Sequence, residues 1–76
     1  MHISSYKTSN TIRVYNITKK NKTIRVLTKR IGKTVGGLMM VELSCNGKKK
    51  RVYVKPRSKR ELDFAVAYFV KEHNLL

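Results

Sequence analysis

Eight side chains suited to binding phosphate groups or stacking on bases recur at alternate positions of extended segments in this 76-residue sequence. Successive side chains of a β-strand point to opposite faces, so every second residue of such a segment shares a face. Lys and Arg neutralise phosphate groups, and Tyr rings stack on unpaired bases. The pattern predicts one cationic and aromatic sheet face made by Arg13, Tyr15, Arg25, Lys29, Lys49, Arg51, Tyr53 and Lys55, with Arg30 as a reserve candidate.

The positive charge of the chain is concentrated in its first 60 residues. The formal net charge is +14, and residues 1–60 hold 17 of the 18 Lys and Arg together with a single acid, Glu42. Residues 61–76 hold Lys71 against three acids. Charge at this density destabilises the free fold by self-repulsion, which a bound polyanion relieves. The distribution favours nucleic-acid binding, and a merely solubilising surface is the alternative.

The sequence offers little for catalysis, metal binding or secretion. Cys45 is the only cysteine, and His2 and His73 are too few and too far apart to indicate a zinc site. Four acids, three of them near the C-terminus, leave little to hold Mg²⁺. We therefore expect no enzymatic activity, no cofactor and no metal. The absence of a signal-peptide pattern and of a membrane-spanning run favours a cytoplasmic, nucleoid or nuclear location.

An Asn46-Gly47 pair between two β-type segments predicts a hairpin whose register is fixed by its turn. Both residues tolerate the positive φ angles of a two-residue type I′ turn. Val41 then faces Val52, and Glu42 faces Arg51 in an opposite-charge cross-strand pair. The predicted core face carries Met39, Val41, Leu43, Val52 and Val54 with Cys45 at its rim, and the cationic face carries Met40, Glu42, Ser44, Lys49, Arg51, Tyr53 and Lys55.

Two more strands are predicted upstream, at residues 11–18 and 23–31, with a basic turn at 19–22 between them. Ile and Val alternate with polar residues in both strands, so we assign them to the core side. That side then holds Ile12, Val14, Ile24 and Val26, and the cationic side holds Arg13, Tyr15, Arg25, Leu27 and Lys29. Residues 1–10 are polar and are expected to be a flexible lead-in to one domain over residues 11–76.

A capped helix is predicted from about residue 59 to 73. Pro56 ends the last strand, and Ser58 followed by Glu61 forms a capping-box pattern before an apolar run. The stripe expected to cover the core face of the sheet is Leu62, Ala65, Val66, Phe69, Val70 and His73. The expected fold is therefore α+β: an antiparallel sheet of three to four strands packed on one C-terminal helix, in the order ββββα.

Three large apolar residues fall on nearly the opposite side of this helix. Either the N-terminal segment or the early strands cover them, or they form a surface for a partner, which would be a second copy of the chain or a host protein. These residues are Phe64, Tyr68 and Leu75.

The order strand, strand, Asn-Gly hairpin, strand and capped helix resembles the plant Apetala/ethylene-response-factor DNA-binding domain and its relatives in phage integrases and homing endonucleases. The resemblance covers residues 23–74, through Arg25-Val26, Gly32-Lys33, Val41-Glu42-Leu43, Asn46-Gly47-Lys48 and residues 60–68. It implies a three-stranded sheet that enters the major groove, and it implies site roles for Arg25, Glu42, Arg51 and Tyr53. The chain departs from the family by having no Trp, by the Lys55-Pro56 region in place of a Gly, and by the additional strand at 11–18.

These patterns together predict a small basic protein that binds duplex DNA through one sheet face, in a regulatory, chromatin-like or viral accessory role. Two alternatives remain open: a protein-interaction module, such as a viral inhibitor that docks on an acidic host protein, and an RNA-binding or ribosome-associated protein. The main DNA contacts are expected from Arg13, Arg25, Arg51 and Lys55, with Lys19, Lys20, Lys22, Lys49 and Arg57 at the rim.

Overall fold

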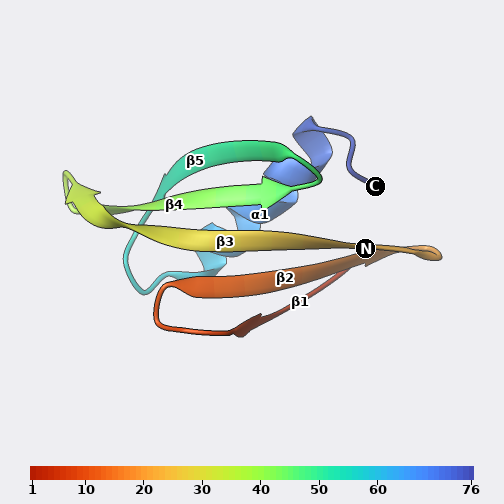
Figure 1. The fold of residues 1–76 in the computed structure, drawn as a ribbon, viewed down its shortest axis with the longest axis horizontal. Helices are drawn as coiled ribbons and strands as arrows, with labels where there is room; N and C mark the ends of the chain where they lie inside the picture. Colours follow the sequence, from red (N-terminus) through yellow and green to blue (C-terminus); the bar gives the residue numbers. More distant parts are fainter.

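The computed structural model shows a five-stranded antiparallel sheet with one helix packed against one of its faces (Figure 1). It describes residues 1–76 except for the side chains of residues 33–35, so Lys33 of the family resemblance lies outside the described side chains. The α+β class is confirmed, but the sheet has five strands where three to four were predicted. The elements are β1 (His2–Lys7), β2 (Ile12–Lys19), β3 (Lys22–Val35), β4 (Leu38–Cys45), β5 (Lys48–Val54) and α1 (Lys59–Glu72).

Strand β1 is the strand that the sequence pattern misses. The segment predicted as a flexible lead-in pairs with β2 along the sheet edge, from His2 opposite Thr18 to Lys7 opposite Arg13. Its Ser-rich sequence has no strong β-propensity, and Ile3 is its one side chain that packs against the core. The strand therefore depends on the hydrogen-bonding edge that β2 offers, which a local pattern does not reveal.

The hairpin of β4 and β5 has the predicted register at all seven pairs, from Met39 opposite Val54 to Cys45 opposite Lys48. Asn46 and Gly47 have φ angles of 51° and 80°, as a type I′ turn requires. The predicted core face is confirmed, because Val41, Leu43, Cys45 and Val54 are buried, and Met39 and Val52 pack against them. The turn chemistry therefore sets which side chains of this hairpin share a face, and the apolar set is the one that packs against the helix.

Helix α1 begins at the predicted cap. The Oγ atom of Ser58 accepts a hydrogen bond from the Glu61 N–H at 3.3 Å. The Glu61 carboxylate accepts from the Lys55 N–H at 2.9 Å, which ties the loop after β5 to the first turn of the helix. Leu62, Val66 and Phe69 are buried against the sheet, as the predicted stripe requires. Among the described residues, no helix is both long and apolar enough to cross a bilayer.

Leu75 is buried in the core, so its predicted place beside Phe64 and Tyr68 is wrong. Asn74 adopts a φ of 51°, and its N–H donates to the Lys71 carbonyl at 3.2 Å. The Leu75 N–H donates to the Val70 carbonyl at 3.0 Å, which completes a Schellman motif. The left-handed residue turns the chain back toward the sheet, and helical periodicity therefore no longer predicts where Leu75 lies.

Candidate nucleic-acid interface

The face of the sheet that points away from α1 is called the outer face here, and its cations come from β3 and β5. Helix α1 crosses behind the sheet and covers the opposite face (Figure 1). Alternation places exposed side chains of Arg25 and Lys29 on the outer face of β3. Strand β5 adds three more exposed side chains to this face. Five of the eight predicted residues therefore share the outer face: Arg25, Lys29, Lys49, Arg51 and Tyr53. Lys55 is exposed directly after β5.

One carboxylate lies among these cations on the described part of the outer face. Glu42 of β4 is opposite Lys29 on one side and opposite Arg51 on the other. The Glu42 Oε2 atom is 3.5 Å from the Arg51 Nε atom, as the predicted cross-strand pair requires. The Arg51 side chain keeps 64% of its surface exposed, so this pair is weak and leaves the guanidinium accessible to a ligand. Among the described side chains of this face, the cations therefore outnumber the acids four to one.

Arg13 and Tyr15 lie on the side of α1, so their predicted place on the outer face is wrong. Tyr15 is opposite Val26, and Arg13 is opposite Thr28. Directly opposed residues of an antiparallel pair share a face, so these side chains point toward the helix. Both faces of strand β2 carry apolar residues, so its own sequence pattern does not decide which face meets the helix. The register with β3 decides it.

The same register reverses the predicted core role of Ile12 and Val14. Val14 is opposite Tyr6 of β1 and opposite Leu27 of β3, and it is buried between them on the outer face. Tyr6 and Leu27 themselves are about half exposed. Tyr6 is an outer-face aromatic that the strand patterns did not predict, because it lies in the polar segment of residues 1–10. The alternation of Ile3 and Ser5 with Ser4 and Tyr6 is the signal that identifies it.

Tyr15 holds the sheet to the helix instead of facing a ligand. Its side chain is fully buried, and its hydroxyl donates a hydrogen bond to the Oδ1 atom of Asp63 on α1. Burial, followed by the hydrogen bond and the charge of Asp63, raises the pKa of Tyr15 well above its ordinary value. This tyrosine cannot stack on a base while the domain is folded.

Tyr15→Phe is expected to lower stability near neutral pH and to flatten its decline at alkaline pH. The variant loses a hydrogen bond to a carboxylate, which contributes about 1.5–3 kcal/mol. Because the folded-state pKa is raised, the contribution is complete below the unfolded value of about 10 and is lost as pH rises above it. Urea unfolding of both proteins from about pH 7 to 11 tests this. Parallel stability curves would contradict the role given to the hydroxyl.

The remaining predicted cations divide between two places. Lys19, Lys20 and Lys22 are exposed at the turn between β2 and β3, at one end of the sheet. Arg30, the reserve candidate, is opposite Val41 and therefore points to the helix side. Arg57 lies in the loop before α1, and with Arg30 it lines a cavity on that side. Neither arginine belongs to the outer face.

Phe64 and Tyr68 form an exposed aromatic pair on α1, with 66% and 60% of their surfaces accessible. The Lys50 Nζ atom lies 5.0 Å from the centre of the Tyr68 ring and 2.9 Å from the Glu72 carboxylate. Neither the N-terminal segment nor the early strands cover this pair. Cys45 is buried and unpaired, and burial raises the pKa of its thiol, as expected for a structural cysteine.

Comparison with known proteins found no matching family model and no significant match among curated proteins or solved structures.

Proposed function

We propose that this protein binds nucleic acid, with duplex DNA as the target, through the outer face of its sheet. The observation that carries the proposal is an open strand layer on the side away from the helix, whose described side chains include four cations and one acid. Lys and Arg that neutralise phosphates release condensed counterions, which favours binding at any sequence. The guanidinium group of Arg25 or Arg51 can also donate two hydrogen bonds to the major-groove edge of guanine.

The distribution of the cations supports a groove-sized contact. They come from β3 and β5, which flank β4, whereas β1 and β2 contribute none to the outer face. Neighbouring strands lie about 4.8 Å apart, so the backbones of β3 and β5 are about 10 Å apart. The major groove of B-DNA is about 12 Å wide. This width agrees with the family resemblance, in which a three-stranded sheet enters that groove.

The positions of the two exposed tyrosines on the outer face favour a duplex over a single strand. Tyr6 is on β1 and Tyr53 is on β5, at the two edges of the sheet. Four strand spacings separate them, about 19 Å, whereas a stacking platform needs neighbouring rings for successive bases. Tyr15, which would have joined them, is buried. The outer face therefore offers distributed charge and no row of rings.

The proposal is tested by the salt dependence of binding. Five outer-side cations, Arg25, Lys29, Lys49, Arg51 and Lys55, predict a slope of about −4.5 for log K against log[salt], at roughly −0.9 per phosphate. Fluorescence anisotropy with a labelled DNA duplex from about 50 to 200 mM salt measures it. Unlabelled duplex DNA is expected to compete better than single strands or duplex RNA, whose major groove is narrow. A flat salt response, or stronger competition by RNA, would refute the assignment.

A second candidate function, docking on an acidic protein, is favoured by the exposure of Phe64 and Tyr68. Aromatic residues of this kind act as anchors at protein interfaces, and the basic sheet would steer the encounter. The two functions depend on different residues, so substitutions can distinguish them. Affinity for a protein partner would depend on Phe64 and Tyr68, whereas affinity for DNA would depend on Arg25 and Arg51.

A further inference from the structure

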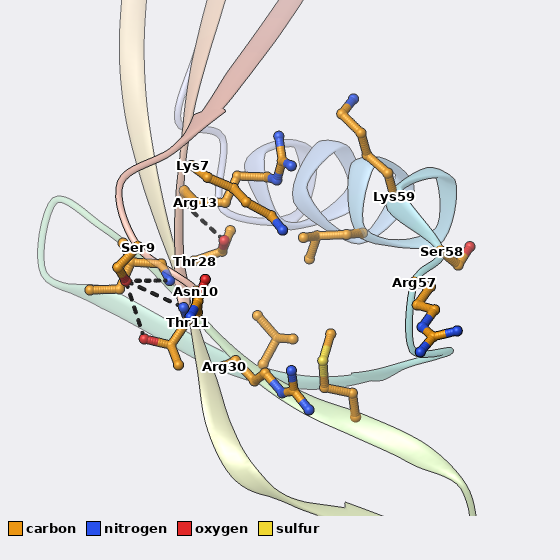
Figure 2. A pocket seen from close by; sticks show the side chains of 14 residues that line it. Lys7, Ser9, Asn10, Thr11, Arg13, Thr28, Arg30, Arg57, Ser58 and Lys59 are labelled. Carbon is orange, nitrogen blue, oxygen red and sulfur yellow. Dashed lines mark hydrogen bonds between the residues drawn. The ribbon is translucent and has the colours of Figure 1, made fainter.

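A second cationic site lies on the helix side of the sheet, away from the outer face. A cavity of about 280 Å³ opens where the turn between β1 and β2, the helix side of β3 and β4, and the start of α1 meet (Figure 2). Its lining contains five cationic side chains and no acidic one: Lys7, Arg13, Arg30, Arg57 and Lys59.

Tertiary pairing brings these cations together from separate segments. Lys7 of β1 is opposite Arg13 of β2, and Arg30 of β3 is opposite Val41 of β4, so all point to the helix side. Figure 2 shows the Lys7 side chain reaching into the space between the strands and α1, with Arg30 and Arg57 on the other side of the opening. A ligand there would be surrounded by positive charge.

Most of this charge has no carboxylate partner. Lys59 is paired with Asp63 at 3.1 Å and turns away from the opening (Figure 2), and Arg13 donates to the neutral Oγ atom of Ser5 at 2.8 Å. Lys7, Arg30 and Arg57 form no ion pair with any described side chain. The positive end of the α1 dipole lies beside them. Mutual repulsion at this point is relieved when an anion binds.

The cavity also has an apolar floor, formed by Met39, Val41 and Leu62. Val41 and Leu62 are buried, and Met39 packs against the core. An inorganic ion would use only the cationic rim, whereas a molecule with both a phosphate and an organic body would use rim and floor. The volume is close to the lower end of the roughly 300–1,000 Å³ that ligand pockets occupy, which suits one small molecule.

We propose that this cavity binds a small organic phosphate of about the size of a mononucleotide. Its phosphate groups would lie between Lys7, Arg30 and Arg57, and its organic body would rest on the apolar floor. The site is separate from the outer face, so the proposal does not depend on the DNA-binding function.

Isothermal titration and amide NMR with ADP test the proposal. A salt concentration of about 150 mM is used because it screens the attraction of ADP to distant cations elsewhere on the surface. We expect saturable one-to-one binding with shifts in residues 7–13 and 57–62. Adenosine, which lacks the charge, is expected not to bind, and inorganic phosphate is expected to bind at least about 10-fold more weakly than ADP. Absence of saturable ADP binding, or shifts confined to the outer face, would overturn the proposal.

A charge-matched pair of double variants separates this site from the outer face. Arg30→Gln with Arg57→Gly is expected to weaken ADP binding by about 10-fold or more, because two charged donors are removed. Arg57 has a φ of 67°, which glycine adopts without strain, so the fold should tolerate the change. Lys49→Gln with Arg51→Gln removes the same charge from the outer face and is expected to leave ADP affinity unchanged.

Duplex DNA binding of both double variants shows which of the two proposals fails. A control pair that weakened ADP binding as much as the cavity pair would overturn the cavity site. A cavity pair that lost DNA affinity but kept ADP affinity would overturn it as well, because the cavity would then belong to the DNA interface. A control pair with unchanged DNA affinity would refute the outer-face function and leave the ADP result interpretable.

Discussion

Arg51→Glu is expected to weaken duplex DNA binding by roughly 10- to 100-fold. The substitution removes a charge-assisted hydrogen-bond donor, with a contribution of about 1.5–3 kcal/mol, and each 1.4 kcal/mol changes an equilibrium constant tenfold. The Arg51 side chain lies on β5 among the outer-face cations and is largely exposed. The slope of log K against log[salt] should also become about one unit shallower. Anisotropy titrations at several salt concentrations measure both effects.

Lys71→Glu is the matched control for this substitution. It makes the same change in net charge, but Lys71 is exposed on the last turn of α1, on the other side of the sheet. Charges separated by more than about 8 Å are largely screened at physiological salt, so its effect should be small. Arg51→Gln belongs in the same series, because a Glu at position 51 would face Glu42 and destabilise the hairpin. Equal weakening by Arg51→Glu and Lys71→Glu would contradict the assignment of the outer face.

Phe69→Ala is expected to cost roughly 3–5 kcal/mol of folding free energy. The Phe69 side chain is fully buried between α1 and the sheet, and its ring meets the His73 ring edge-on at 5.0 Å. At about 0.05–0.15 kcal/mol per residue, a domain of this size has only about 4–11 kcal/mol of stability. The variant should therefore lose a quarter or more of its folding free energy, roughly, and unfold at a clearly lower urea concentration. Urea denaturation followed by circular dichroism measures the loss.

Phe64→Ala, on the same helix, is the control for Phe69→Ala. Phe64 is 66% exposed, and surface substitutions of this kind usually change stability by no more than about 0.5 kcal/mol. Similar losses for the two variants would mean that the helix packs on the sheet through a different face.

The parts of the fold that depend on neighbours in the sequence were predictable. Asn46-Gly47 determines the register of β4 and β5 because a two-residue turn leaves no freedom in the pairing. Ser58 determines the start of α1 because its hydroxyl satisfies an N–H group of the first turn. The apolar stripe of α1 follows from a period that the helix itself imposes. In each case the interacting groups are a few residues apart.

The rest depends on contacts between distant segments. The face of Tyr15 is decided by its pairing with Val26, strand β1 by the edge of β2, and the position of Leu75 by a left-handed residue that turns the chain into the core. The pairing of β2 with β3 also places Arg13 on the helix side, where it lines one cavity with Lys7, Arg30 and Arg57.

The fold class, the β4–β5 hairpin, the capped helix and the concentration of positive charge in the first 60 residues all follow from local sequence patterns. The division of that charge between an outer sheet face and a cavity beside the helix depends on how the strands pair. Alternation places a strand's residues in two sets, and pairing with the next strand decides which set meets the core.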